Sequence, residues 1–158
     1  MIWSTIYTLD GELSRALLVK FYLEKIIEAK RDLVYSIFSD YENYEKILPS
    51  CFPSIRIRSV RGNVAVVEEH VNFGPDEFVI MAKHVSKKSV LHEVFVIGGD
   101  IKGSYFKQQF VEVPQGTKVI VDVEMKFGKL KIKKLFGTSK YAQYYEEILN
   151  DFGKLCEN

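Results

Sequence analysis

Residues 33–53 read LVYSIFSDYENYEKILPSCFP, and this stretch decides the fold class. Its first part repeats apolar residues with the 3.6-residue period of a helix, at Leu33, Val34, Ile37 and Phe38. Asp40 suits the N-cap of a second short helix, whose inner face is then Tyr41, Tyr44, Ile47 and Leu48. Pro49 stops that helix, because proline lacks the N–H and disfavours helical geometry at the preceding residue. Two short helices in a chain otherwise rich in strands predict a curved sheet with a cavity beside the helices.

The composition predicts one globular domain. The chain has 158 residues, of which 47% are hydrophobic and 27% are charged, and its net charge is +1. This charge gives no global field that favours nucleic acid or an anionic membrane. Cys51 and Cys156 lie far apart without a CxxC spacing, so we expect neither a zinc site nor a disulfide framework. Because no apolar run reaches the roughly 20 residues of a membrane span and no signal-peptide pattern opens the chain, a cytoplasmic protein is expected.

Alternation of apolar and polar residues predicts a series of strands. The first covers residues 17–28, and the later ones lie near 54–61, 64–73, 77–86, 89–97, 103–113 and 117–127. Their connections carry turn residues, at Gly62-Asn63, Gly74-Pro75-Asp76, Lys87-Lys88, Gly98-Gly99-Asp100 and Pro114-Gln115-Gly116. Short connections between consecutive strands predict an antiparallel meander. Residues 1–16 form either an extra strand turned at Asp10-Gly11 or a loose arm, and residues 17–158 a single domain.

The last segment changes to a helical period. From Ser139 onward a continuous apolar stripe runs through Ala142, Tyr145, Ile148, Leu149, Phe152, Leu155 and Cys156. Since only one side of this helix is apolar, we expect residues 139–156 to lie on the concave face of the sheet.

This order of elements resembles the START-related helix-grip superfamily, which includes polyketide cyclases, coenzyme-Q-binding proteins and birch-pollen-allergen-like lipid carriers. Residues 40–51 look like the D-x-x-x-Y-x-x-x-L-P-x-C segment of the coenzyme-Q-binding branch, and Gly103 with residues 113–119 resembles the family's final hairpin. The likeness covers residues 17–157. The chain departs from that branch in one respect. The branch commonly has a tryptophan in its last strand pair, whereas here Phe110 stands near that place and Trp3 is the only tryptophan. The resemblance implies an α+β helix-grip fold: a curved antiparallel sheet of about seven strands around a long C-terminal helix, with two short helices after the first strand.

The predicted turns also predict which side chains face the cavity. A two-residue turn at Gly62-Asn63 pairs Arg61 with Val64, and the same alternation is carried through the later connections. The expected ligand-binding residues are Phe78, Ile80, Phe95, Phe106, Gln108, Phe110, Val121, Val123, Met125 and Phe152. A single bulge would invert every face beyond it.

In this register a polar line crosses the apolar wall. It contains Glu68, Glu93 and Gln108, with His70 and His84 diagonal to it. These side chains either bind the polar head group of a ligand or act as general acids and bases, the candidates for catalysis being Glu68, His70, His84 and Glu93. The alternative is that they lie at the rim or on the outer face. No metal and no cofactor is predicted, since His70, His84 and Glu68 lack a compact ligand spacing.

A basic cluster precedes the last helix, at Lys126, Lys129, Lys131, Lys133 and Lys134. It indicates either transient contact with a membrane surface or a solvated edge that resists aggregation, and no specific nucleic-acid partner is predicted. The sequence contains no G-x-S-x-G motif and no phosphate-binding loop. The predicted function is binding or transport of a hydrophobic small molecule, such as a lipid, an isoprenoid or quinone, or a polyketide-like compound. The alternatives are a cyclase or dehydratase using Glu and His, and a module that binds macromolecules.

Overall fold

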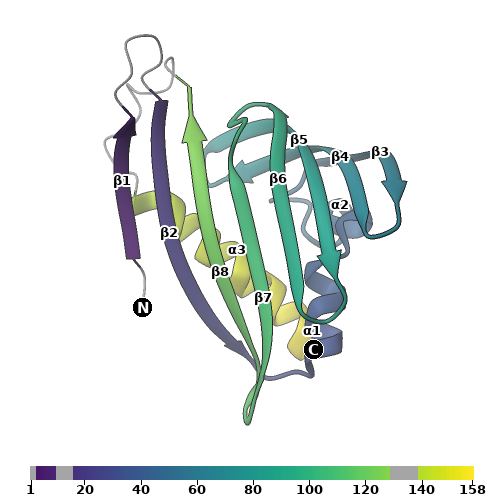
Figure 1. The fold of residues 1–158 in the computed structure, drawn as a ribbon. Helices are drawn as coiled ribbons and strands as arrows, with labels where there is room; N and C mark the ends of the chain where they lie inside the picture. The colour runs from purple at the N-terminus through teal and green to yellow at the C-terminus, as the bar shows by residue number, and fades with distance from the viewer. Residues whose placement is uncertain (1–2, 10–15, 129–138) are drawn as a thin grey trace.

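Eight antiparallel strands form one sheet in the computed structural model, which describes residues 3–9, 16–128 and 139–158. The strands are β1 (Trp3–Leu9), β2 (Ala16–Ile27), β3 (Ser54–Arg61), β4 (Val64–Phe73), β5 (Asp76–Lys87), β6 (Leu91–Gly99), β7 (Tyr105–Val113) and β8 (Gly116–Phe127). They lie in the order β1-β2-β8-β7-β6-β5-β4-β3 (Figure 1). The meander from β3 to β8 is therefore extended by β2, which pairs with β8 on one side and with β1 on the other.

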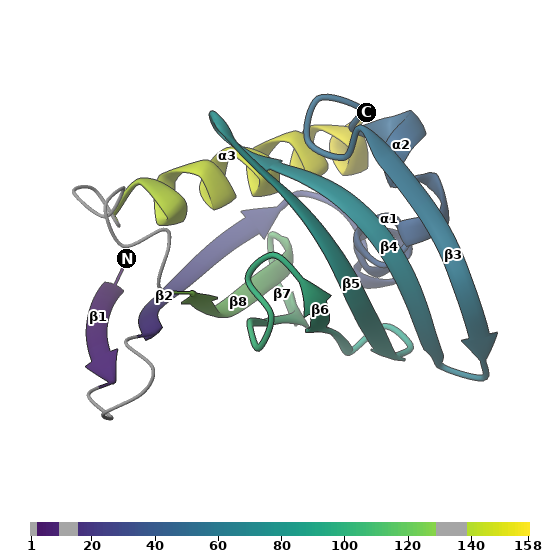
Figure 2. The same ribbon diagram turned by 90° about the horizontal axis from the view of Figure 1, so that it is seen from above.

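Helices cover the concave side of this sheet. They are α1 (Arg31–Phe38), the 3-10 helix η1 (Tyr41–Asn43), α2 (Tyr44–Ile47) and α3 (Ser139–Glu157). Figure 2 shows α3 running along the hollow of the sheet. Helix α1 packs against α3 and the strands β6, β7 and β8, whereas α2 lies beside β3. The predicted architecture is confirmed: a curved antiparallel sheet holds a long C-terminal helix, and short helices follow β2.

The short helices form as the apolar period predicts. Val34 and Phe38 are one turn apart on α1 and both are completely buried. Asp40 precedes η1, but its carboxylate accepts hydrogen bonds from the side-chain amide of Asn43 and makes no capping bond to the backbone. Asp40 therefore occupies the predicted N-cap position, but its side chain does not cap the helical segment. The segment ends at Ile47, two residues before Pro49.

The long helix α3 buries one face against the sheet and α1. Its buried residues include Ala142, Tyr145, Leu149, Phe152 and Cys156, as the stripe predicts. The Phe152 ring stacks on Phe38 with centroids 4.7 Å apart, and the Tyr145 ring lies 5.9 Å from both Phe21 and Phe106. These contacts join α3 to β2, β7 and α1 in one core.

The β4–β5 hairpin departs from the predicted register. Phe73 pairs with Asp76, so the loop contains only Gly74 and Pro75, and Asp76 already belongs to β5. This removes one residue from the predicted connection and reverses the faces of β4 relative to β5. The concave face of β4 consequently carries Ala65, Val67, Glu69, Val71 and Phe73. Glu68 and His70, predicted to face the cavity, lie on the outer face.

The β5–β6 hairpin departs in the opposite sense. Lys87 pairs with Leu91, so the loop is residues 88–90, with Ser89 in the left-handed region at φ 61°. The added residue places His92, Val94 and Val96 on the concave side. Glu93 and Phe95 are therefore on the outer face, where Phe95 is 36% exposed. Their predicted places in the cavity are wrong.

The remaining predicted faces agree with the structure. Phe78, Ile80, Phe106, Gln108, Phe110, Val121, Val123, Met125 and Phe152 are all buried. On β8, apolar residues occupy every second position from Val119 to Phe127, and all but one of the positions between them are polar. This pattern indicates the buried face independently of any turn.

Candidate functional site

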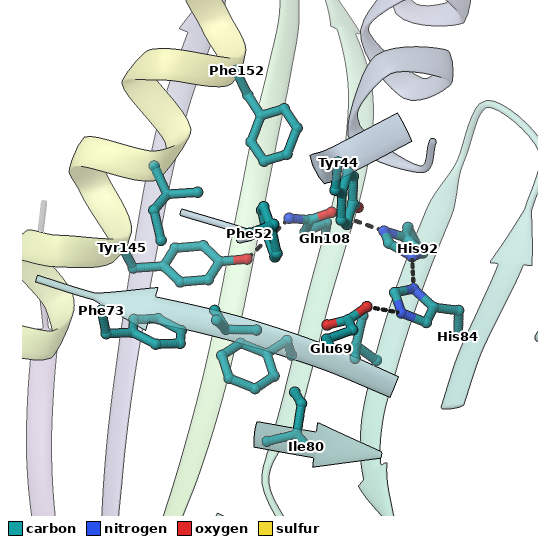
Figure 3. Close-up of a pocket in the computed structure, with 14 residues that line it drawn as sticks. Tyr44, Phe52, Glu69, Phe73, Ile80, His84, His92, Gln108, Tyr145 and Phe152 are labelled. Atoms are coloured by element: carbon teal, nitrogen blue, oxygen red, sulfur yellow. Dashed lines mark hydrogen bonds and ion pairs between the residues drawn. The ribbon is translucent and has the colours of Figure 1, made fainter. Parts of the chain in front are cut away.

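A cavity of about 60 Å³ lies between the concave face of the sheet, α2 and α3. Six aromatic residues contribute to its wall, namely Tyr44, Phe52, Phe73, Phe106, Tyr145 and Phe152. Four aliphatic residues, Val71, Ile80, Val94 and Ile148, complete the apolar part. Four further lining residues are polar: Glu69, His84, His92 and Gln108. Figure 3 shows these polar side chains gathered on one side of an otherwise apolar space.

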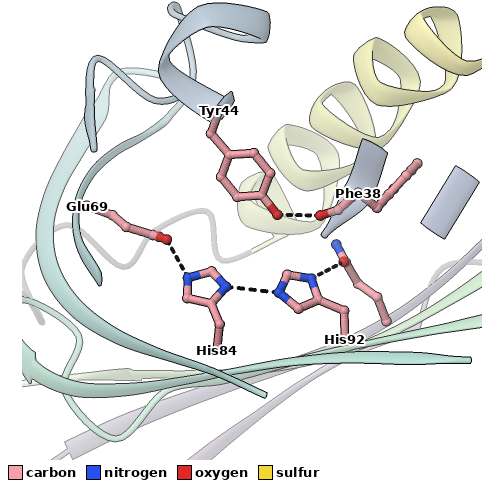
Figure 4. A network of polar contacts seen from close by, with 6 residues as sticks. Phe38, Tyr44, Glu69, His84 and His92 are labelled. Atoms are coloured by element: carbon pink, nitrogen blue, oxygen red, sulfur yellow. Dashed lines mark hydrogen bonds and ion pairs between the residues drawn. The ribbon is translucent and has the colours of Figure 1, made fainter. Parts of the chain in front are cut away.

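The polar residues form one continuous chain of hydrogen bonds across four strands and into α3 (Figures 3 and 4). Glu69 Oε1 lies 2.6 Å from His84 Nε2, and His84 Nδ1 lies 2.9 Å from His92 Nε2. His92 Nδ1 lies 3.1 Å from Gln108 Oε1, and Gln108 Nε2 donates to the Tyr145 hydroxyl over 2.9 Å. Neighbouring strands bring these residues together because β4, β5, β6 and β7 are adjacent in the sheet.

This chain is almost completely shielded from solvent. Glu69 is 3% exposed, and His84 and His92 are each 1% exposed. Burial is the main reason that the pKa of His92 falls to about 3, and the neighbouring His84 lowers it further while the bond to Gln108 opposes the shift. Burial also raises the pKa of the Tyr145 hydroxyl, although its hydrogen bond with Gln108 acts against this. His92 is therefore neutral and Tyr145 protonated at neutral pH.

Counting hydrogens along the chain assigns a donor and an acceptor to each contact. With Gln108 donating to Tyr145, its carbonyl oxygen accepts from Nδ1–H of His92. Because His92 is neutral, its Nε2 accepts from Nδ1–H of His84. The contact between His84 and Glu69 then holds one proton, either on the imidazole beside a carboxylate or on the carboxyl group beside a neutral imidazole. The pair has zero net charge in both forms, which reduces the cost of burying it.

The tyrosine of α2 closes the cavity. The Tyr44 hydroxyl donates to the backbone oxygen of Phe38, as Figure 4 shows, and its ring stacks on Phe52 with centroids 4.5 Å apart. Burial raises the pKa of Tyr44 well above its usual value, so this donor also stays protonated. The two short helices are thereby fixed to each other over the site.

The structure brings together only part of the predicted ligand-binding set. Ile80, Phe106, Gln108 and Phe152 line the cavity. Five others are buried in the core beside it without lining it: Phe78, Phe110, Val121, Val123 and Met125. The exception is Phe95, which lies on the outer face.

Of the four candidate acids and bases, only His84 lines the cavity. Glu68 is bound to Arg58 at 2.6 Å, His70 lies 3.7 Å from Glu77, and Glu93 accepts from the Tyr105 hydroxyl, all on the outer face. Among the carboxylates and histidines of the cavity, those that the sequence did not predict are Glu69 and His92. Glu69 lies on the same face as Val71 and Phe73, which alternate with His70 and Asn72, and could have been found from that pattern. Strand β6 is apolar on both faces and gave no signal for His92.

Within the described ranges, no group of three or more His, Cys, Asp or Glu side chains is arranged to hold a metal ion. None of the helices in the described part of the chain has the length and apolarity needed to cross a membrane. Most of the predicted basic cluster, Lys129, Lys131, Lys133 and Lys134, falls outside the described residues.

Solved structures share this fold at low sequence identity. The Zhui aromatase/cyclase from Streptomyces sp. R1128 superposes with a TM-score of 0.72 at 13% identity, covering 90% of this chain and 94% of that chain. A protein of Thermus thermophilus gives a TM-score of 0.71 at 16% identity, over 85% and 94% of the two chains. Major latex-like protein 151 from Panax ginseng gives 0.70 at 11% identity, over 88% and 97%. At these identities the likeness shows the fold alone, which is the helix-grip fold.

Sequence comparison gives the family. No curated protein sequence matches the chain significantly. Residues 27–140, however, match the sequence model described as polyketide cyclase / dehydrase and lipid transport. This match spans more than half of the chain and includes the strands that carry Glu69, His84, His92 and Gln108. The protein is thus a member of the polyketide cyclase / dehydrase and lipid transport family.

Proposed function

We propose that this protein binds a hydrophobic small molecule in the cavity between the sheet and α3. The observation that carries the proposal is the wall itself, in which aromatic and aliphatic side chains surround one cluster of polar groups. Ligand sites commonly combine a mostly apolar wall with a few polar groups that fix orientation. Membership of a family described by cyclase, dehydrase and lipid-transport functions supports the same conclusion.

The size of the cavity limits how a ligand enters. About 60 Å³ holds roughly four water molecules, whereas a cavity of about 150 Å³ accepts benzene. A ring compound therefore fits only when wall side chains move. The half-buried Val94 and Ile148 are the lining residues with the most freedom to do so, because they lie at the margin of the core. Each Å² of apolar ligand surface removed from water then contributes about 25 cal/mol.

Titration with Nile red, a neutral apolar fluorophore, tests this proposal. Val94→Phe should fill the cavity and weaken binding at least ten-fold, while Val79→Phe on the exposed outer face serves as the matched control and should bind as wild type does. Equal binding by wild type and Val94→Phe would place the probe elsewhere and contradict the proposal. Native mass spectrometry of the purified protein adds a direct search for a ligand that co-purifies.

Acid–base catalysis is a second candidate, and the 2.6 Å contact between Glu69 Oε1 and His84 Nε2 is the observation that favours it. Such a pair can remove a proton from a carbon next to a carbonyl group and return it elsewhere. Hydrogen–deuterium exchange at the central carbon of 2,4-pentanedione, followed by NMR, measures this step directly. Glu69→Gln should slow protein-dependent exchange by about 10²–10⁴-fold, and Glu68→Gln should not. Exchange that is unaffected by Glu69→Gln would rule out this role.

A further inference from the structure

Two polar groups of the cavity retain unused hydrogen-bonding capacity. The Tyr145 hydroxyl accepts a hydrogen bond from Gln108 and keeps its own hydrogen to donate. Glu69 uses Oε1 for His84, and its Oε2 has no hydrogen-bond partner among the described residues. Figure 3 shows both groups directed toward the middle of the pocket. A ligand therefore meets one donor, on Tyr145, and one oxygen, on Glu69.

The charge of the wall disfavours an anion. None of the described residues that line the cavity is Lys or Arg. A buried carboxylate costs several kcal/mol unless it is paired with a cation or accepts several hydrogen bonds. The single donor of Tyr145 does not meet this need, and Glu69 adds an acidic group of its own. An uncharged ligand is consequently preferred.

The aromatic walls favour a ring. The rings of Phe73, Phe106 and Tyr145 lie within 6.2 Å of one another, and their planes differ by at most 23°. Their nearly parallel orientation offers flat surfaces to a planar molecule, and aromatic rings pack on each other in offset arrangements. A flexible alkyl chain would not use this orientation.

We infer that the cavity selects uncharged ring compounds with a hydroxyl group, the phenol class, and rejects ring carboxylates. This inference rests on the proposed function. The ligand hydroxyl accepts from Tyr145 and donates to Glu69, so that these two residues determine specificity. A hydroxyl is the smallest group that satisfies one donor and one acceptor at the same time.

Three single-ring probes of similar size test the inference on the wild-type protein. Phenol has the hydroxyl, toluene lacks any polar group, and benzoate is an anion at pH 7.5. Protein-observed NMR titrations of the 18.3 kDa chain measure all three affinities. We expect phenol to bind at least ten-fold more tightly than benzoate and several-fold more tightly than toluene, as for one or two buried hydrogen bonds.

Two variants assign the selectivity to named residues. Tyr145→Phe removes only the hydroxyl, so it should weaken the affinity for phenol about ten-fold and change the affinity for toluene less than two-fold. Glu69→Gln should reduce the ratio of phenol to benzoate affinity about ten-fold. The matched controls are Tyr105→Phe and Glu68→Gln, which make the same chemical changes on the outer face of the sheet and should leave all affinities unchanged.

The outcomes separate this inference from the function on which it rests. Benzoate that binds as tightly as phenol, or toluene that binds more tightly than phenol, overturns the inference even though ligand binding itself stands. Nile red binding without measurable phenol binding overturns it as well. Failure of Nile red and of all three probes would instead reject the proposed binding function, and the inference with it.

Discussion

At the residue scale, His92 determines how the site responds to acid. It is enclosed between His84 and Gln108, and burial lowers its pKa to about 3, whereas a histidine in an unfolded chain titrates near 6.5. Between these two values the unfolded chain binds a proton that the folded chain does not. The free energy of unfolding should therefore decrease as the pH falls from 6.5 toward 3, by at most about 1.4 kcal/mol per pH unit.

Urea unfolding at a series of pH values measures this slope. His92→Asn should flatten it, because Asn does not titrate, while His70→Asn replaces a histidine of the outer face and should leave it unchanged. An identical slope in wild type and His92→Asn would assign the acid sensitivity to other groups.

Two turns at the scale of elements explain why the site was only partly predictable. Aspartate is a residue type common in turns, yet Asp76 begins β5 and accepts a hydrogen bond from Tyr141 of α3 over 2.7 Å. That partner is 65 residues away in the sequence, so local patterns give no indication of it. In the next hairpin Ser89 adopts φ 61°, a conformation more common for glycine or asparagine, and lengthens the loop by one residue. The elements themselves could be predicted because periodicity is local, whereas the faces of β4 and β6 depend on these two loop lengths.

The Gly74 turn should be intolerant of any side chain. Its φ is 58°, and an added Cβ would lie 2.4 Å from the Tyr144 ring of α3. Gly62 has nearly the same φ, 59°, but nothing lies within 4 Å of its Cβ position, which makes it a matched control for backbone strain. In both alanine variants the left-handed conformation should lower the free energy of unfolding by about 1–2 kcal/mol. Gly74→Ala should lower it further because of the contact with Tyr144. Equal losses in chemical denaturation would mean that the turn does not press on α3.

Helix α3 should lose much of its contact with the core when Phe152 is shortened. This side chain is buried against Phe38, Tyr44 and Phe52, and Phe152→Ala should cost about 3–5 kcal/mol. Lys154→Ala on the exposed side of the same helix should change the free energy of unfolding by less than about 0.5 kcal/mol. Equal stability of the two variants would show that α3 is not required for the core.

For the molecule as a whole, β2 is the strand that joins the N-terminal part of the chain to the meander β3–β8. It pairs with β8, which lies about a hundred residues later, and its Leu23 is buried in the core shared with α3. Leu23→Ala should cost about 2–5 kcal/mol. Because one core joins all layers, amide hydrogen exchange should accelerate in β4 and β5 as well as in β2. Protection that persists in β4 and β5 alone would divide the fold into two cooperative units.

The two buried imidazoles also have a consequence for spectroscopy. Protons held between Glu69, His84 and His92 are shielded from water, so they should exchange with solvent slowly enough to be seen as separate proton resonances downfield of the amides. Such signals are usually lost on exposed histidines. Their positions would shift when a ligand alters the sharing of the proton, and isotope labelling of the histidine rings would assign them. These proton resonances would therefore allow the occupancy of the cavity by a ligand to be followed without attaching a dye.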